Sequence, residues 1–139
     1  MASFQCDIVS AENEIFSGPV TALSATGSLG ELGILPGHAP LLTGIRPGPV
    51  RLTLEDGSED VFFASGGYLE VQPGIVTILA DTALRADDID EAAAKSAQEA
   101  AERELADNRA DVNLASAAAA LAESLAQQRT LDELRKRRR

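Results

Sequence analysis

Hydrophobic and polar residues alternate along much of the first half of the chain. Val50, Leu52 and Leu54 are separated by polar residues and lead into the pair Asp56-Gly57, after which the apolar residues 61–63 follow. A period of two residues is typical of a strand with one buried face. Because Asp-Gly suits the positive φ angles of a two-residue type I′ turn, we predict a hairpin here. The largely β-branched run 75–79 predicts another strand, which is buried.

Turn-forming residues divide this part of the chain into short segments. All 11 glycines and all six prolines lie within residues 18–74. Turn signals spaced about ten residues apart predict an all-β sandwich or barrel. The composition changes near residue 86, since 16 of the 54 residues from Ala86 onward are alanine and none is glycine or proline. We therefore predict two domains, an N-terminal β-sandwich over residues 1–85 and a C-terminal helical domain over residues 86–139.

The second domain is predicted to be an antiparallel two-helix hairpin with a basic tail. Asp88 followed by Glu91 has the spacing of a helix start. The polar stretch 107–111 predicts the connection between the helices. The second helix is expected to run from about Leu114 into the tail.

Both helices have thin apolar faces. At 100° per residue, the first carries a stripe of Ile89, Ala93, Ser96 and Ala100, and the second carries a stripe of Leu114, Ala118, Leu121 and Leu125. Alanine contributes little burial energy but is the best helix former. The pattern therefore favours either an arm that can leave its resting place without melting or a permanently packed alanine-rich hairpin. Leu131 and Leu134 point away from the stripe, which predicts either a frayed end or a contact with another protein.

The charge is distributed unevenly along the chain. The formal net charge is −10, yet six basic residues lie within residues 129–139, and the preceding 128 residues carry −14. Such an acidic body repels nucleic acid and anionic lipid, whereas the basic tip is expected to bind something acidic. A few exposed bases support nucleic-acid binding only weakly, so no nucleic-acid partner is expected.

Few residues suit catalysis or metal binding. Cys6 is the only cysteine and His38 the only histidine, so an intrachain disulfide is impossible. A zinc site or a Cys/His nucleophile pair is not expected either. No apolar run approaches the ~18 residues of a membrane span, and the first residues lack the basic and apolar regions of a secretory signal. We predict a protein with no catalytic residues and no metal.

Six segments of the chain resemble a known family. They are residues 7–12, 16–18, 30–42, 45–50, 65–74 and 76–83. Together with the alanine-rich C-terminal pair, they resemble the epsilon subunit of bacterial F-type ATP synthases. The resemblance implies a sandwich of about ten strands followed by a two-helix hairpin, in agreement with the pattern of hydrophobic residues.

The resemblance also implies a function. The chain would be a non-catalytic central-stalk subunit that binds the gamma subunit, stands on the ring of c subunits and meets the alpha and beta subunits. It would couple the rotor parts and would inhibit ATP hydrolysis when its helices extend along gamma. The complex would make ATP from ADP and phosphate using the proton gradient. The chain would be peripheral at the cytoplasmic face of the bacterial inner membrane and would not be a homo-oligomer.

Individual residues acquire roles from the same resemblance. Contact with the c ring is implied for Gly30, Glu31, Gly33 and His38. In the extended state, contact with an acidic segment of the beta subunits is implied for Arg129, Arg135, Lys136 and Arg137, with Arg138 and Arg139 beside them. Some family members bind ATP through a motif that here begins at Ile89-Asp90, but Ala93 occupies its arginine position. Because alanine cannot pair with a phosphate, we expect at most a weak nucleotide site and no cofactor.

Three other interpretations stay open at the level of sequence. Glu31 is, in the first, only a solvated loop acid. In the second, Glu31 and His38 are the active residues of a small hydrolase. In the third, the basic tail binds nucleic acid.

Overall fold

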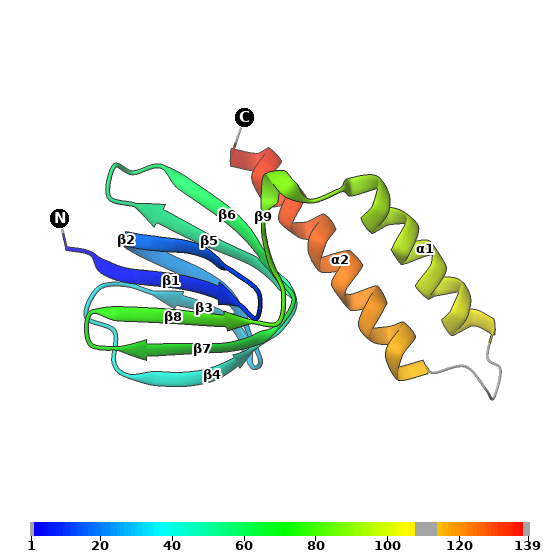
Figure 1. Ribbon diagram of the computed structural model, residues 1–139, viewed down its shortest axis with the longest axis horizontal. Helices are drawn as coiled ribbons and strands as arrows, with labels where there is room; N and C mark the ends of the chain where they lie inside the picture. The colour runs from blue at the N-terminus through cyan, green and yellow to red at the C-terminus, as the bar shows by residue number, and fades with distance from the viewer. Residues whose placement is uncertain (1, 108–113, 138–139) are drawn as a thin grey trace.

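The computed structural model describes residues 2–107 and 114–137. In this part of the chain, nine strands precede two long helices (Figure 1). The strands are β1 (Phe4–Ser10), β2 (Glu14–Gly27), β3 (Gly30–Ile34), β4 (Leu41–Ile45), β5 (Gly48–Leu54), β6 (Glu59–Ala64), β7 (Gly67–Gln72), β8 (Ile75–Ala80) and β9 (Ala83–Arg85). The helices are α1 (Glu91–Asp107) and α2 (Leu114–Arg137), preceded by the 3-10 turn η1 (Ala86–Asp88). The predicted β-sandwich followed by a two-helix hairpin is confirmed.

β2 is long enough to belong to both layers of the sandwich. Its first half pairs with β1 and its second half with β3 and β5, and Val20 pairs with both Phe4 and Leu54. One layer therefore contains β4, β7, β8, β1 and the start of β2. The other contains β3, the end of β2, β5, β6 and β9. β1 and β8 run parallel, whereas their other neighbours in the sheet run antiparallel to them.

Alternate residues of the strands fill the core between the layers, as the period of two predicts. Val50 and Leu52 of β5 are buried, while Arg51 between them faces outward. The fully buried members of the core include Cys6, Ile8, Val20, Leu52, Phe62, Leu69 and Ile78. Removing this apolar surface from water is the main stabilising contribution to the sandwich.

The hairpin between β5 and β6 forms as predicted, but its turn is of a different type. The Gly57 N–H donates to the Leu54 carbonyl at 3.0 Å, and the Leu54 N–H donates to the Ser58 carbonyl at 2.8 Å. The loop therefore has three residues and ends in Gly57 at a left-handed φ of 87°, unlike a two-residue type I′ turn. The Asp56 carboxylate favours this loop, because it accepts hydrogen bonds from the Ser58 hydroxyl and N–H, which lower the pKa of Asp56.

The first helix begins later than the Asp88–Glu91 spacing predicts. Asp88 lies in η1, where the Ile89 N–H donates to the Ala86 carbonyl at 3.2 Å. The cap of α1 is instead Asp90, whose Oδ1 accepts from the Ala93 N–H at 3.0 Å. α2 begins at Leu114, as predicted. Apart from Asp107, which ends α1, the predicted connection 107–111 lies outside the described residues.

The apolar face predicted for the first helix is wrong. Ala93, Ser96 and Ala100 are exposed. The buried or half-buried residues of α1 are instead Ala94, Gln98, Ala101 and Leu105. The register differs because Ile89 precedes the helix and therefore does not mark its buried face.

The stripe predicted for the second helix is also wrong. Ala118 and Leu125 are exposed, Leu121 is half-buried, and the side chain of Leu114 lies outside the described residues. The small residues Ala117 and Ser124 are buried instead. Gln128 of α2 donates to Gln98 of α1 at 2.6 Å, so a polar pair joins the two helices.

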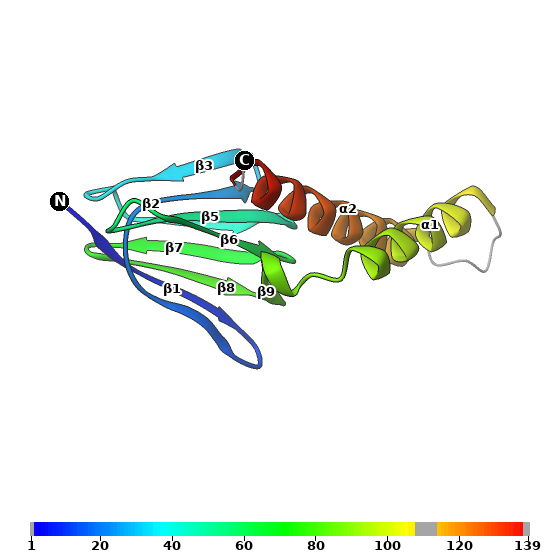
Figure 2. The same ribbon diagram turned by 90° about the horizontal axis from the view of Figure 1, so that it is seen from above.

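The helical hairpin contacts the sandwich at one end. The C-terminal turns of α2 lie on β5 and β6, while the opposite end projects away from the strands (Figures 1 and 2). A small apolar cluster, here called the docking cluster, joins the two parts and consists of Phe63, Ile89 and Ala126, with Leu84 and Leu131 packed against it. Leu131 departs from the predicted stripe because it faces the sandwich. Leu134 is half-buried near the same end, so neither leucine belongs to a frayed end here.

Candidate docking surfaces

A network of polar side chains crosses the outer face of the sheet beside the end of α2. Arg51 of β5 donates through Nε to Ser24 Oγ on β2 at 2.8 Å. Its Nη2 lies 3.2 Å from Glu31 Oε1 on β3, and its Nη1 lies 3.3 Å from Glu133 Oε2 on α2. We call these four residues the Arg51 network. Sequence reasoning singled out Glu31 but missed Arg51 and Glu133, because only the fold brings β3, β5 and α2 together.

The residues predicted to meet the c ring spread along β3 and beyond it. Gly30 begins the strand, and Glu31 and Gly33 follow on its outward face. Gly33 lines a hollow of about 410 Å³ together with Ala22, Ser24 and Arg51. His38 lies beyond the other end of β3, where its Nδ1 donates to the Ala39 carbonyl at 2.6 Å. The strand rises ~3.3 Å per residue, so His38 and Glu31 do not share a site, which contradicts the hydrolase interpretation.

The opposite layer carries an exposed apolar patch that sequence reasoning missed. Leu42 of β4, Tyr68 of β7 and Leu79 of β8 are 68%, 60% and 53% exposed. Tyr68 pairs with Leu79, and Gly44, two residues after Leu42, pairs with Tyr68. We call these three residues the apolar stripe. Each belongs to a different strand, so only the strand register shows that they are neighbours.

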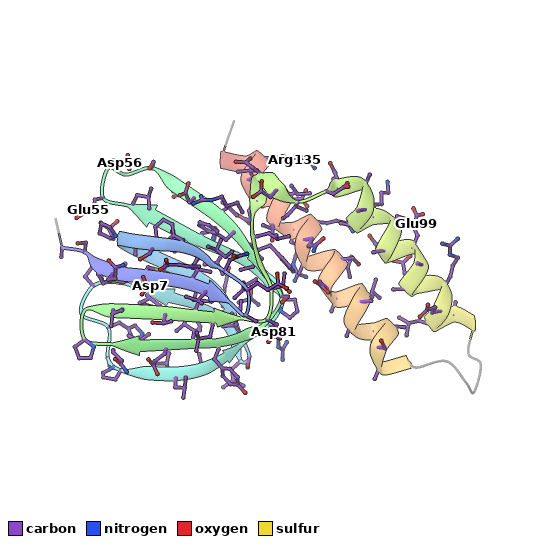
Figure 3. All side chains as sticks on the ribbon, viewed as in Figure 1. Asp7, Glu55, Asp56, Asp81, Glu99 and Arg135 are labelled. Atoms are coloured by element: carbon purple, nitrogen blue, oxygen red, sulfur yellow. The ribbon has the colours of Figure 1, made fainter. Side chains whose placement is uncertain are left out.

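The apolar stripe also corrects a prediction about residues 75–79. Val76 and Ile78 are buried, but the outward-facing Leu79 is not. A hollow of about 400 Å³ lies beside it, lined by Val9, Tyr68 and Asp81 among others; Asp81 follows the end of β8 (Figure 3). The apolar run predicted a strand buried on both faces. Instead, Leu79 at its end lies on a surface that favours a partner.

The cations of the basic tip have partners within the chain. Arg129 donates to the Pro47 carbonyl at 3.1 Å. Arg135, near the end of α2 (Figure 3), pairs with Glu91 in the first turn of α1. Lys136 lies 3.7 Å from Glu133. The side chain of Arg137, and Arg138 and Arg139 as a whole, lie outside the described residues. In this conformation Arg129 joins α2 to the sandwich and Arg135 joins α2 to α1, whereas Lys136 pairs within α2.

Ile89 and Asp90, which mark the possible nucleotide site, have structural roles. Ile89 belongs to the docking cluster. The Asp90 carboxylate caps α1, and Ala93 is exposed. The expectation of weak nucleotide binding therefore stays a prediction.

Metal-binding and reactive groups are sparse in residues 2–107 and 114–137. Within these ranges, no group of three or more His, Cys, Asp and Glu side chains is arranged to hold a metal ion. Burial, and secondly the charge of Asp7, raises the pKa of the Cys6 thiol to about 12, so this thiol is unreactive near neutral pH. Neither helix, as far as it is described, has the length and apolar character needed to cross a membrane.

Comparisons with known proteins place this geometry in context. Residues 3–86 match the family model of the ATP synthase delta/epsilon chain β-sandwich domain. An ATP synthase epsilon chain of Chromohalobacter salexigens is 56% identical over 137 residues, which are 99% of this chain and 97% of the relative. An epsilon chain of Acinetobacter baumannii is 55% identical over 137 residues and 99% of both chains.

Solved structures agree with the sequence relatives. A chain of the Euglena gracilis mitochondrial ATP synthase, from a cryo-EM structure of OSCP, F1 and the c-ring, is similar with a TM-score of 0.84 and 25% identity. The match covers 94% of this chain and 82% of the other. A chain from the central stalk and c-ring of the Tetrahymena thermophila enzyme, at 15% identity, has a TM-score of 0.50 over 60% of this chain and 67% of its own. That second likeness concerns the fold alone.

Proposed function

The chain belongs to the family of ATP synthase delta/epsilon chains, and from this we propose that it is a non-catalytic rotor subunit that joins gamma to the c ring and restrains ATP hydrolysis through its helical hairpin. The observation that carries the proposal is the extent of the match. The relatives at 55% and 56% identity span 99% of the chain, so they include the hairpin as well as the sandwich. The Euglena likeness covers 94% of the chain within an assembly that contains F1 and the c-ring.

The apolar stripe is the surface we assign to the gamma subunit. Leu42, Tyr68 and Leu79 form exposed apolar neighbours on the outer face of one layer. Exposed apolar patches on soluble domains mark interaction sites, and aromatic residues are enriched at the centre of interfaces. A rotor subunit needs such a contact, because it must stay attached while torque passes through it.

The outer face of β3 is the surface we assign to the c ring. Glu31 carries a charge there, and Gly30 and Gly33 let a partner's backbone approach closely, since no side chain covers them. His38 belongs to a different end of the sandwich and is left out of this surface. The proposed surface includes Ser24 and Arg51, which border the same hollow.

The hairpin is suited to the regulatory role because its contact with the sandwich is small. Thr130 of α2, one turn after Ala126 of the docking cluster, is fully buried, yet its hydroxyl donates to the Ala126 carbonyl of its own helix at 2.8 Å. The Ser124 hydroxyl likewise donates to the Leu121 carbonyl at 3.0 Å. Because these groups are satisfied within α2, undocking leaves neither without a partner. The helix can therefore separate from the sandwich and stay helical.

The extended state gives the basic tip its second set of partners. In that state an acidic segment of the beta subunits, beside the alpha subunits, would be contacted by the basic residues Arg129, Arg135, Lys136 and Arg137. We propose no cofactor, because Ala93 lacks the charge that a phosphate needs. We propose no nucleic-acid partner, because the acids of the chain already pair with Arg135 and Lys136.

The bacterial relatives support a bacterial setting for the complex. We propose that the complex makes ATP from ADP and phosphate with the proton gradient, and that the chain lies at the cytoplasmic face of the inner membrane. It is attached there through the other subunits, as one copy per rotor and not as a homo-oligomer.

Co-purification with tagged gamma subunit tests the proposal. We expect the unchanged chain and Leu29→Asp to co-purify with gamma, and Tyr68→Asp to be lost. Leu29 is a matched control because it is a fully exposed apolar residue outside the apolar stripe. If all three chains bind alike, the assignment of the stripe is wrong. If none binds gamma while all are folded by circular dichroism, the rotor function is wrong.

A further inference from the structure

We propose that Arg51 links Glu31 to the docking of α2, so that a positively charged partner bound at Glu31 tightens the hold of the sandwich on the hairpin. The proposal concerns the regulation of the surfaces described above and so rests on the proposed function. It arises from one geometric fact. The guanidinium of Arg51 pairs both with Glu31 on the sandwich and with Glu133 on α2.

The two acids stand in different positions relative to solvent. The Glu31 side chain is 67% exposed, whereas that of Glu133 is 23% exposed. Glu31 can therefore turn to a partner without any movement of the backbone. Glu133 belongs to α2, which lies on β5, so undocking of α2 removes it from Arg51.

The two acids compete for Arg51 and do not assist each other. Both are negative, so they repel across the guanidinium that they share. An acid can also assist a second one by holding a flexible arginine in place. Here that assistance is unnecessary, because Ser24 Oγ already holds Arg51 Nε at 2.8 Å. Loss or neutralisation of Glu31 therefore removes repulsion and leaves Arg51 to Glu133.

The charge of Lys136, near this network, does not alter the direction of the effect. Lys136 lies 3.7 Å from Glu133, but both residues belong to α2 and are separated by three positions. This pair moves as a unit, so it contributes about equally to the docked and undocked states. The Arg51–Glu133 pair, in contrast, joins α2 to the sandwich and is lost when α2 undocks.

In the assembled rotor the consequence is a reciprocal coupling. A cationic group of the c ring that binds Glu31 would favour the docked hairpin, which is the state that leaves hydrolysis unrestrained. Undocking of α2 would in turn return Arg51 wholly to Glu31 and weaken binding of that cation. Linkage requires both effects to have the same magnitude.

Thiol labelling of the isolated full-length chain tests the coupling without any other subunit. Thr130→Cys places a thiol at a fully buried position of α2, so its labelling rate reports how often the helix undocks. Cys6 acts as an internal control, because it lies in the core of the sandwich and reacts only when the strands separate. In this background, we expect Glu31→Gln to slow the labelling of the introduced thiol by about 1.5- to 5-fold, the range of exposed ion pairs.

Two further variants make the test specific. In the presence of Glu133→Gln, the change Glu31→Gln should have no effect on the rate, because position 133 then carries no charge for Glu31 to repel. Glu55→Gln removes one acid at the far end of the sandwich (Figure 3) and should leave the rate unchanged in both backgrounds. Faster or unchanged labelling in Glu31→Gln overturns the proposal, as does an effect that survives Glu133→Gln. Because the chain is alone, this outcome is independent of whether it binds gamma.

Discussion

The substitution Phe63→Ala isolates the contact between the hairpin and the sandwich. Phe63 is fully buried, yet it faces α2 and belongs to the docking cluster and not to the core between the layers. Its neighbour Phe62 faces that core. Removing the Phe63 ring should therefore weaken docking of α2 while the sandwich stays folded. The sequence of the hairpin itself is unchanged, so any change in its docking comes from the contact surface on the sandwich.

The expected magnitude follows from the burial of the ring. Burying a phenylalanine side chain contributes about 1.5–3 kcal/mol. Pro49, directly opposite on β5, stays beside the ring in both states, so docking accounts for only part of the burial. We take about 1.5–2 kcal/mol as the loss. Since 1.4 kcal/mol is about a factor of ten, the undocked population should rise about 10- to 30-fold.

Labelling of the Thr130→Cys thiol measures this population. Phe63→Ala should accelerate labelling by the same factor, and Leu125→Ala should change it less than about two-fold. Leu125 is the matched control because it is an exposed leucine of α2 outside the docking cluster. If Phe63→Ala accelerates labelling less than two-fold, the cluster does not hold the hairpin. If Cys6 becomes labelled at the same rate, the sandwich has opened and the assignment of Phe63 to the docking contact is wrong.

The same variant connects docking with regulation. In the assembled complex, Phe63→Ala should lower the rate of ATP hydrolysis, because a hairpin that undocks more often spends more time in the inhibitory state. Hydrolysis that is unchanged while labelling is faster would refute the regulatory role and leave the docking contact intact.

Two further predictions concern the sandwich. Gly67→Ala should cost at least about 3 kcal/mol of unfolding free energy in urea denaturation, because Gly67 has φ 135° and an added Cβ would lie 2.0 Å from the Leu79 carbonyl oxygen. The control Gly33→Ala meets nothing within 4 Å and should change the unfolding free energy by less than about 0.5 kcal/mol. Equal losses in the two variants would refute the steric argument. Between pH 9.0, the unfolded pKa of Cys6, and about pH 12, its folded pKa, this thiol keeps its proton only in the folded state. In this range the unfolding free energy of the unchanged chain should therefore fall with rising pH, by about 1.4 kcal/mol per pH unit more than that of Cys6→Ala. Parallel curves of unfolding free energy against pH would contradict the burial effect.

The layers of the sandwich were predictable because they depend on local pattern. The alternation around Val50 and Leu52 and the turn residues at Asp56-Gly57 act within a few positions of each other. The place where the hairpin docks also had a signal that we did not use. Residues 61–64 are apolar without alternation, and all four are buried. Such a run indicates a strand covered on both faces, here by the core on one side and by α2 on the other.

The faces of the helices and the functional surfaces depend on contacts that no local pattern contains. In an alanine-rich helix almost every direction has small apolar residues, so the period of 3.6 does not distinguish the buried face. The apolar stripe requires the register of three strands. The Arg51 network joins residues 20 and 82 positions apart, and its members are ordinary surface charges until β3, β5 and α2 are placed together.

The relative strength of these contacts determines what controls the hairpin. Arg135 of α2 and Glu91 of α1 are each more than half exposed, so the ion pair between the two helices contributes only about 0.2–1 kcal/mol. An acidic segment on another subunit would replace this pair with a similar one. The net free energy that this exchange adds to the extended state is therefore smaller still. The docking cluster contributes more through Phe63 alone. We therefore infer that the apolar contact sets the position of the conformational equilibrium and that the ion pairs, including those of Arg51, adjust it by a few-fold. A hairpin balanced in this way can respond to the small charge changes that a turning rotor presents.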